Sequence, residues 1–437
     1  MLDQRHKNMN FQQFTILGEE IHAEFKRRNF DEQALPDLAA GALARANLEA
    51  DFRLDQLTEF LIATNIEQQP SLQFSNLPLI VYFCDEFYIE LLIWTEATTS
   101  IHQHAFSGAF RVLVGSSFHS VYEFNEHERI SSRLLLGDTR LKRAELLRTG
   151  DVRPIHSGRS GLAHALFHLD RPSVTVVVRN GSEPWARPQY ELEPPHVAYA
   201  RPELREDSKV RLLSRLLTVA DALNHEEAVE LLVSKGTHMD FPRLLMVLVE
   251  NYERLNKDAD WLRFINAARE VHGHLAEHLV QMVKSRKRKA SIVAARNSVK
   301  DPDLRFFLAL LLNLPSRTWV YQLIQENFPR DLPEILCHQW LQRLRDEESL
   351  SNAFFELAKK VHLGVDTFGA RLKAALPFER GDPRTEVILR AAVTGISQQA
   401  VGTHLQETLG DSMVSPEALE AYARLRHLSE LEPFFAD

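Results

Sequence analysis

The sequence of 437 residues predicts an α+β protein with three parts: a helical N-terminal region, a small antiparallel β-barrel and a large all-helical C-terminal domain. Two observations predict this fold class. Apolar residues recur at three- and four-residue steps near both ends of the chain, which is typical of amphipathic helices. In the middle, short segments rich in β-branched and aromatic residues alternate with turn residues, which is typical of a sandwich or small barrel. The chain also exceeds a single average core, so roughly two or three domains are expected.

The N-terminal region, residues 1–74, is predicted to be helical and to pack on the barrel. Phe14, Leu17, Ile21 and Phe25 follow one another at three- and four-residue steps, so these side chains share one face of a helix. Proline and glycine are sparse in this stretch, as helix interiors require.

The barrel is predicted over residues 75–183. Its clearest strands are short and separated by glycine-containing turns, and they span residues 87–94, 110–114, 120–124 and 174–179. Strands that follow one another this closely indicate a sandwich or small barrel rather than βαβ units.

A proline-rich connector, residues 184–206, is expected to separate the barrel from the helical domain. Its Pro188, Pro194 and Pro195 favour an extended and semi-rigid chain. The helical period returns over residues 207–437, where we expect about ten helices and find no convincing fixed repeat.

Two fragments of the helical domain resemble each other, Asp301-Pro302 and Asp382-Pro383. Both combine an acidic residue with a proline, which is the usual chemistry of a helix start. We therefore interpret the likeness as two similar helix N-termini and not as a repeat.

The feature that most indicates a function is the pair His102 and His104. Residues two apart on a strand point to the same face, so both imidazoles meet the same surroundings. A third imidazole from a separate strand would complete a face of three nitrogens for a divalent metal, with positions left for substrate or oxygen. His164 is the candidate, and His156 and His168 compete with it. On a regular strand His168 shares a face with His164.

The parts around these histidines resemble the cupin superfamily, small antiparallel barrels whose first motif carries His-x-His and whose second carries a single histidine. Within it, the chain is similar to the cysteine dioxygenase (thiol dioxygenase) branch. Trp94 precedes the His-x-His motif, and no glutamate follows the second histidine. Gly161-Leu162 precedes His164 and a final valine-rich strand. The resemblance implies that the three histidines bind iron(II), and it favours His164 over its competitors because the family motif places Gly-Leu before that ligand.

The chain departs from the family pattern at two places. Residues 81–85 contain no arginine, where the family clamps the substrate carboxylate, and the last strand, residues 175–179, lacks the family's histidine and tyrosine. Recognition of free cysteine is therefore not expected. Arg179, Arg111 and Arg153 are the candidates for holding an anionic substrate from another direction.

Other ionisable residues near the barrel have simpler interpretations. His119 and His127 are expected to be surface or packing residues, and Glu145 is expected to be a loop acid without a visible partner. Glu123 could be a fourth ligand if its side chain points into the barrel. The simpler interpretation is that it faces outward, as alternate residues of a strand do. Cys84 is expected to be a buried apolar residue.

Composition limits the classes of function. The formal net charge of −9 is unfavourable for a protein built mainly to bind nucleic acid, which needs a basic face. The basic run of residues 284–289 is interpreted as a solvated loop or helix end. Only two cysteines occur, Cys84 and Cys337, so no disulfide framework is expected and a cytoplasmic location fits best. No apolar run approaches the ~20 residues of a membrane-spanning helix.

The sequence therefore predicts an iron(II)-dependent, three-histidine cupin oxygenase that uses dioxygen on a metal-chelating small molecule or peptide-borne substrate. His102, His104 and His164 are its candidate metal ligands, with zinc or nickel as the other ions that imidazoles accept. Arg179 and Tyr82 are the candidate catalytic side chains. The helical domain is a candidate site for a protein partner or for a homodimer. The alternative is a non-catalytic metal- or ligand-binding module that serves a helical protein-interaction domain.

Overall fold

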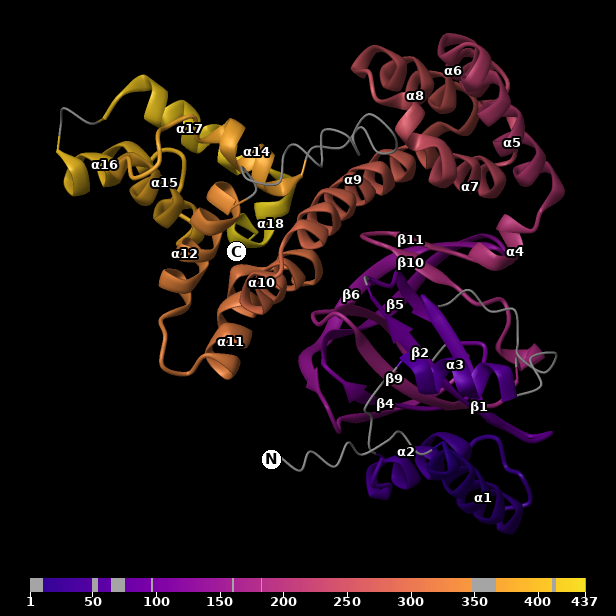
Figure 1. Cartoon of the computed structure of the whole chain (residues 1–437). Coiled ribbons are helices and arrows are strands. Elements are labelled where there is room, and N and C mark those ends of the chain that lie inside the picture. The colour runs from indigo at the N-terminus through magenta and orange to yellow at the C-terminus, as the bar shows by residue number, and fades with distance from the viewer. Residues whose placement is uncertain are drawn as a thin grey trace. The chain divides into compact units, whose positions relative to one another are not determined.

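The computed structural model describes residues 11–48, 54–63, 75–95, 97–158, 161–181, 183–347, 367–410 and 414–436 (Figure 1). The predicted α+β class is confirmed, because the described chain holds N-terminal helices, a closed antiparallel barrel with a second sheet, and a large helical C-terminal region. The chain divides into two compact units. The barrel unit contains Met1–Glu123 and Glu145–Glu191, and the helical unit contains Phe124–Ala144 and Leu192–Asp437.

This division treats one segment differently from the predicted domains. Residues 124–144 group with the helical unit, whereas the predicted barrel domain, residues 75–183, included them. The two strands concerned, β5 (Ser116–Ser131) and β6 (Leu134–Arg148), are long enough for each to have one end in either unit. The predicted domain limits otherwise stay a prediction.

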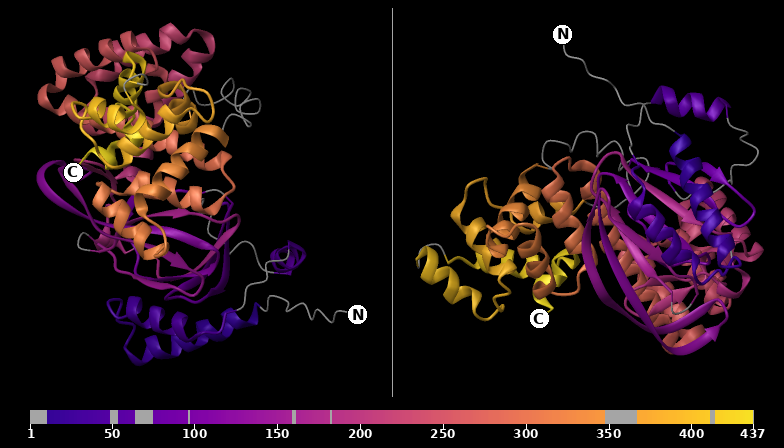
Figure 2. Two further views of the ribbon diagram at one scale, coloured as in Figure 1. Left: turned by 90° about the vertical axis from the view of Figure 1, so that its left-hand side faces the viewer. Right: turned by 90° about the horizontal axis from the view of Figure 1, so that it is seen from below.

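The N-terminal helices are α1 (Gln12–Arg27), α2 (Leu35–Arg45) and α3 (Leu54–Ala63). The apolar face predicted for α1 is buried, with Phe14 and Ile21 completely covered. Together with α2 it packs on one face of a five-stranded sheet (Figure 2). These helices therefore cover one face of that five-stranded sheet.

The strands form two antiparallel sheets. The first has the order β1-β2-β9-β4-β7 and the second is a closed barrel with the order β10-β11-β6-β5-β8-β3. The strands of the first sheet are β1 (Leu77–Phe83), β2 (Tyr88–Trp94), β4 (Gly108–Val114), β7 (Val152–Ile155) and β9 (Ser173–Arg179). The second sheet adds to β5 and β6 the strands β3 (Ile101–Gln103), β8 (Ala163–His168), β10 (Glu191–Glu193) and β11 (Val197–Tyr199).

Both faces of the first sheet are buried, which explains its nearly continuous apolar strands. On β9, Val174, Val176 and Val178 belong to the core that contains α1 and α2. Val177 points the other way and joins a core that contains Leu166 of β8. The inner face of this sheet therefore packs on the barrel sheet, and the space between the two sheets is where a site can be enclosed.

The helical unit contains α4 (Arg201–Arg205), α5 (Ser208–Leu223), α6 (His225–Ser234), α7 (Phe241–Asn251), α8 (Asp258–His272), α9 (Ala276–Ser298), α10 (Pro302–Asn313), α11 (Arg317–Asn327), α12 (Pro333–Glu347), α14 (Phe368–Ala375), α15 (Pro383–Val393), α16 (Val401–Leu409), α17 (Pro416–Arg426) and α18 (Glu432–Phe435). The predicted Asp-Pro helix starts are confirmed. Asp301 accepts hydrogen bonds from the backbone of Asp303 and Leu304, and Asp382 accepts one from Arg384. None of the described helices combines the length and the apolar character needed to cross a membrane.

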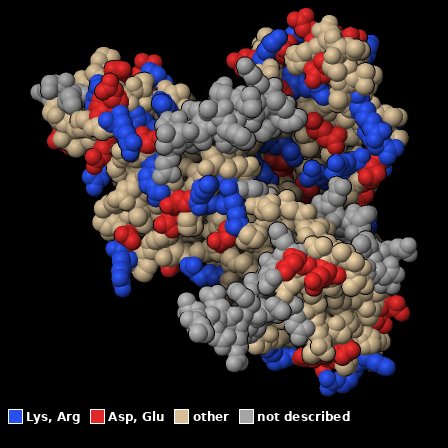
Figure 3. Space-filling model, viewed as in Figure 1, with Lys and Arg blue, Asp and Glu red and all other residues tan. Residues whose placement is uncertain are grey.

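The basic run of residues 284–289 lies in the middle of α9, so its interpretation as a loop or helix end is wrong. Arg286 donates to the Tyr199 hydroxyl at 2.9 Å and pairs with Glu193 at 2.8 Å. Arg288 donates to a backbone carbonyl of α10 at 2.5 Å. On the face shown in Figure 3, Lys and Arg side chains of the helical unit are interspersed with Asp and Glu. At least these two arginines therefore serve packing within their own unit.

Candidate metal centre

The three histidines predicted to bind metal meet on two paired strands. His102 on β3 and His164 on β8 are register partners, and His104 follows β3 directly. Only 3%, 5% and 2% of His102, His104 and His164 are exposed. One ring nitrogen of each lies within 4.8 Å of those of the other two. The structure therefore brings together the trio that the sequence indicated.

The spacing of the nitrogens suits a single metal ion. Nε2 of His104 and Nε2 of His164 are 2.8 Å apart. Metal–imidazole bonds of about 2.0–2.1 Å place two ligands at right angles about 3 Å apart, so this pair fits neighbouring corners of an octahedron. Within the part of the chain that the structure describes, no carboxylate or thiol joins this cluster. Three imidazoles suit iron, copper, nickel or zinc and leave coordination positions for a substrate.

The surroundings keep two of these imidazoles in the neutral form that binds metal. Burial, followed by electrostatic repulsion from the neighbouring His102 and Arg179, lowers the pKa of His104 well below 6.5. Burial, followed by His104 and His102, likewise lowers the pKa of His164 well below 6.5. Metal ligands must be deprotonated, so at neutral pH neither ring has to lose a proton to become a ligand.

A backbone hydrogen bond fixes the third imidazole. Nδ1 of His102 lies 2.9 Å from the carbonyl oxygen of Ser100. A carbonyl only accepts, so Nδ1 donates and carries the ring proton. In the neutral ring the lone pair is then on Nε2. The bond thus selects both the tautomer and the orientation of this candidate ligand.

A longer hydrogen-bond chain leads away from His164. Its Nδ1 lies 2.9 Å from Nε2 of His119 on β5, and Nδ1 of His119 lies 3.1 Å from a carboxylate oxygen of Glu145 on β6. Arg153 completes the chain by donating to the two oxygens of Glu145 at 2.9 and 2.5 Å. Burial alone would raise the pKa of the Glu145 carboxyl, but the hydrogen bonds from His119 and Arg153 outweigh it and hold that pKa well below its usual range.

His119 and Glu145 correct two expectations from the sequence. His119 is fully buried and bonded to a candidate ligand, not a simple surface or packing residue. Glu145 lies on a strand rather than in a loop, and it contacts both His119 and Arg153. Neither motif spacing nor strand alternation in the sequence predicts that these residues lie near His164, because their proximity depends on the pairing of β5 with β8. His127, by contrast, is exposed as expected.

The two histidines that compete with His164 do not join the cluster. His156 is exposed. His168 stacks on Trp94 with ring centres 4.6 Å apart, and its Nδ1 lies 2.9 and 2.7 Å from the hydroxyls of Ser117 and Ser173. The surroundings of His168 therefore account for it as a packed and hydrogen-bonded side chain of the barrel interior.

Arg179, the first candidate catalytic side chain, lies near the histidines. Its guanidinium carbon is 3.5 Å from the centre of the Phe106 ring, and that ring packs on His104 with centres 4.6 Å apart. Glu90 of β2 pairs with Arg179 at 3.4 Å and is almost completely buried. A positive charge is therefore held one aromatic ring away from a candidate ligand.

Tyr82, the second candidate, lies on the opposite face of the sheet, so the structure does not bring it to the histidines. Its ring packs so closely on α1 that a Cβ at Gly18 would collide with it. A β-bulge explains this placement, because Ile80 pairs with Glu90 whereas Tyr82 pairs with Ile89. The bulge moves Tyr82 from the inner face, which Glu90 shares, to the outer face that the helices cover.

The remaining candidates for an anionic substrate or a fourth ligand are engaged or placed elsewhere. Arg111 donates to the backbone carbonyls of Leu43 and Ala46 at 2.7 and 2.6 Å. Arg153 is committed to Glu145, and Glu123 is not part of the metal cluster. Of the three arginines considered, Arg179 is the one beside the histidines.

Aromatic side chains form the immediate surroundings of the cluster. Besides Phe106, the ring of Phe110 lies 6.0 Å from that of His164 and 5.8 Å from that of His119, measured between centres. Both phenylalanines belong to an apolar core that also contains Leu92, Trp94, Val112, Leu147, Ile155, Leu166 and Val177. Apolar walls of this kind exclude water and strengthen the electrostatic interactions inside them.

A second group of ligand-type side chains has a simpler explanation. His22, Cys84 and Glu86 lie within 4.8 Å of one another and are each half-buried. His22 and Glu86 are within ion-pair distance at 3.3 Å, and Cys84 donates to the Phe87 carbonyl at 3.3 Å. These contacts account for the cluster without an ion, and they show that Cys84 is only partly buried and has a polar contact.

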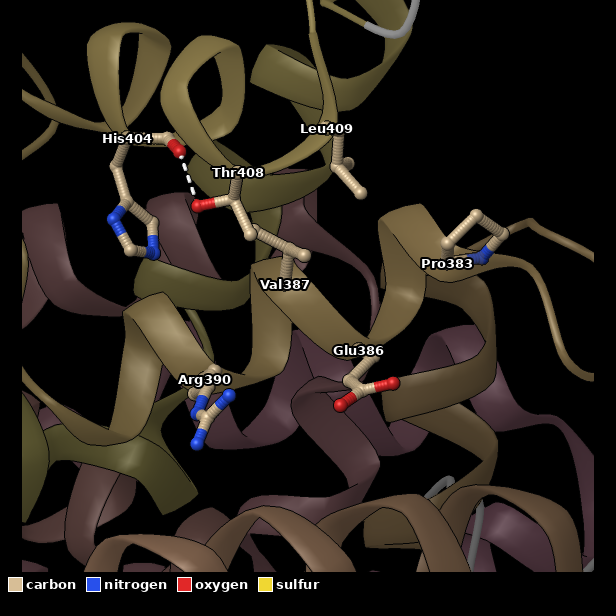
Figure 4. Close-up of a pocket in the computed structure, with 7 residues that line it drawn as sticks. All are labelled: Pro383, Glu386, Val387, Arg390, His404, Thr408 and Leu409. Carbon is tan, nitrogen blue, oxygen red and sulfur yellow. Dashed lines mark hydrogen bonds between the residues drawn. The ribbon is translucent and has the colours of Figure 1, made fainter.

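The helical unit has a pocket of its own, with a volume of about 390 Å³ (Figure 4). Glu386 and Arg390 of α15 and His404 and Thr408 of α16 line it. The Thr408 hydroxyl donates to the His404 carbonyl at 2.7 Å, a contact within one helix. An acid, a base and a histidine in an open pocket do not indicate one ligand chemistry, so the three-histidine cluster remains the candidate functional site.

Comparisons with known proteins add structural likenesses only. No protein-family model matches the chain, and no curated protein matches it. Hydroquinone 1,2-dioxygenase PnpCD, solved with Cd2+ and 4-hydroxybenzonitrile, is 17% identical to this chain, with a TM-score of 0.18. The match covers 24% of this chain and 64% of PnpCD, which is under two thirds of the length of PnpCD. Hydroquinone 1,2-dioxygenase from Sphingomonas sp. TTNP3 is 13% identical with a TM-score of 0.20, over 32% of this chain and 87% of that one. DMSP lyase DddQ from Ruegeria pomeroyi DSS-3 is 17% identical with a TM-score of 0.21, and the match covers 40% of this chain and 98% of that one. These TM-scores are too low to transfer an activity to this chain.

Proposed function

We propose that this protein is a metal-dependent oxygenase of the cupin type, in which His102, His104 and His164 hold iron(II). The observation that carries the proposal is the convergence of three buried imidazoles whose ligand atoms lie within 4.8 Å of one another. Their order along the chain, a His-x-His motif followed by a single histidine, resembles the order of the two cupin motifs. A site with three imidazoles differs from the two-histidine, one-carboxylate iron site by one negative charge.

The proposed substrate is an organic anion, free or carried by a peptide, that chelates the metal. Three neutral imidazoles leave the charge of a divalent ion uncompensated, so an anionic chelator binds the open positions favourably. The guanidinium of Arg179, which pairs with Glu90 at 3.4 Å, offers N–H donors to an anionic group beside Phe106 and His104. The rings of Phe106 and Phe110 offer apolar contacts to the rest of the molecule. A thiolate or carboxylate chelator meets these requirements.

Bound iron would supply the electron transfer between a chelated substrate and dioxygen. The chain's own residues have narrower tasks. The three imidazoles fix the position of the ion, and Arg179 attracts and orients an anionic group. The aromatic side chains limit access of bulk water, which strengthens the attraction between the site's positive charge and the substrate.

Metal analysis and oxygen uptake test this proposal. The purified protein is expected to hold about one equivalent of iron, since one set of ligands binds one ion. With iron(II) it is expected to consume oxygen in the presence of a member of a panel of chelating thiols and carboxylates. His102→Ala and His104→Ala are expected to abolish metal binding and oxygen uptake. His156→Ala is the matched control, because His156 is exposed and lies outside the cluster.

Three results would contradict this proposal or favour another function. Protein that binds no metal and whose stability is unchanged by a chelator would contradict the metal centre itself. Zinc or nickel without oxygen uptake would favour non-oxidative chemistry. Metal binding without turnover of any member of the panel would favour the alternative, a non-catalytic module that serves the helical domain.

A further inference from the structure

We propose that His119 and Glu145 are positioning residues of this metal centre: Glu145, acting through the ring of His119, keeps the proton of His164 on Nδ1 and so keeps Nε2 available to the metal. The inference rests on the proposed function and goes beyond it, because neither residue belongs to the ligand cluster.

The direction of the hydrogen bonds follows from the chemistry of the partners. An ionised carboxylate only accepts, so Nδ1 of His119, 3.1 Å from Glu145, donates and carries the ring proton. In a neutral His119 ring, Nε2 then has the lone pair. Nδ1 of His164, 2.9 Å away, must therefore donate to it, and the lone pair of His164 is left on Nε2. That atom lies 2.8 Å from Nε2 of His104.

The opposite arrangement is unfavourable. A His119 that donates to His164 through Nε2, with a neutral ring, would direct the lone pair of its own Nδ1 at the carboxylate oxygen of Glu145. It would also place the proton of His164 on Nε2, where a metal has to bind. Arg153 prevents the carboxylate from relieving this repulsion by protonation, because it donates to both oxygens and stabilises the ionised form. The carboxylate thus selects one tautomer for two successive rings.

The hydrogen-bond chain from His164 through His119 also keeps the negative charge of Glu145 away from the ion. A metal-bound histidine with a carboxylate partner is a more basic and better oriented ligand. Here His119 lies between the carboxylate and the ligand, so Glu145 can act on His164 without entering the cluster. The charge of the ion then remains available to an anionic substrate. His102, by comparison, is oriented by a neutral backbone carbonyl.

Packing supports a positioning role for this ring. His119 is completely buried, and Phe110 lies edge-on to it with ring centres 5.8 Å apart. The rings of His119 and His164 are perpendicular, at 88°, with centres 5.1 Å apart. A ring held from several sides can transmit an orientation, whereas an exposed ring would rotate.

Titration of the full-length, metal-free protein with Co2+ against a competing chelator tests the inference. His119→Phe keeps an aromatic ring and removes both hydrogen bonds, and Glu145→Gln keeps the shape and removes the charge. His127→Phe, an exposed histidine on the same strand, is the matched control. The Kd for Co2+ is expected to rise about 10- to 100-fold in His119→Phe and by a smaller factor in Glu145→Gln, and to stay unchanged in the control.

Two further readouts separate positioning from general damage. The visible absorption bands of the bound Co2+ are expected to shift in both variants, because a displaced ligand changes the geometry around the ion, while the Tm of the metal-free Glu145→Gln protein stays close to that of the wild type. Unchanged affinity and unchanged bands in both variants would overturn the inference. If His119→Phe does not fold, Glu145→Gln decides alone. A wild-type protein that does not bind Co2+ would instead overturn the proposed function, and the inference with it.

Discussion

The barrel unit and the helical unit both bury ionisable side chains, but the two units use them differently. In the helical unit, buried ionisable side chains pair with an opposite charge or with the backbone. Glu430 pairs with Arg371 at 2.7 Å, and Arg345 donates to a backbone carbonyl at 3.3 Å. In the barrel unit, ring nitrogens of His104 and His164 lie 2.8 Å from each other and share a cluster with a third histidine. Burial alone therefore does not indicate a candidate functional site, whereas convergence of similar donor atoms does.

The largest effects are expected from a matched pair of core substitutions, Phe110→Ala in the barrel unit and Phe307→Ala in the helical unit. Both side chains are almost completely buried, and each is expected to cost about 3–5 kcal/mol of the free energy of unfolding of its unit. Phe110→Ala is also expected to weaken metal binding, because that ring packs beside His164 and His119. Hydrogen exchange resolved by segment gives the two stabilities, and a Co2+ titration gives the affinity. Equal metal affinity in the two variants would contradict a metal site that depends on the barrel unit alone.

A second pair compares the buried ion pairs of the two units. Arg179→Ala leaves Glu90 buried without its cation, and Arg371→Ala does the same to Glu430. Each is expected to lower the free energy of unfolding by up to about 3 kcal/mol, because an uncompensated buried charge is costly. Only Arg179→Ala is expected to raise KM for an anionic chelating substrate. Adding Glu90→Gln to Arg179→Ala is expected to restore stability but not KM, so a recovery of both would assign Arg179 a purely structural role.

The pH dependence of the metal-free barrel unit follows from its histidines. Burial lowers the pKa of His104 and His164 well below 6.5, so below that pH the unfolded chain binds more protons than the folded one. The stability that these two rings contribute is complete above about pH 6.5 and is lost as the pH falls below that value. Denaturant unfolding between pH 7.5 and 5 measures the slope. His164→Phe is expected to reduce it, and an unchanged slope would mean that folding does not lower the pKa of this ring.

The smallest effect is expected from an exposed ion pair of the helical unit, Arg263 with Glu230. Both side chains are about half exposed, at 51% and 55%. Arg263→Ala is expected to change the free energy of unfolding by less than about 1 kcal/mol and to leave metal binding unchanged, since water screens such pairs. Thermal unfolding checks this outcome, and a large loss would mean that the pair contributes to packing.

Local patterns predicted much of the fold because their physical causes are local. The three- and four-residue spacing of apolar residues from Phe14 to Phe25 predicted the buried face of α1. Asp301 and Asp382, each followed by a proline, predicted two capped helix N-termini. The basic run in α9 was placed wrongly, because its many charges resemble a loop while its arginines in fact contact Tyr199 and Glu193. Charge describes exposure only on average, and tertiary partners decide each case.

By itself, the sequence determined that His102 and His104 lie on the same side of the chain, because a two-residue step along extended residues brings both side chains to one side. Tertiary structure decided the rest of the site. The pairing of β3 and β5 with β8 brought His164 and His119 into it, and β6 supplied Glu145. A bulge in β1 moved Tyr82 out of it. The physical reason is that strand register depends on hydrogen bonds and packing between residues far apart in the chain, and a shift of one residue reverses the face that a side chain reaches.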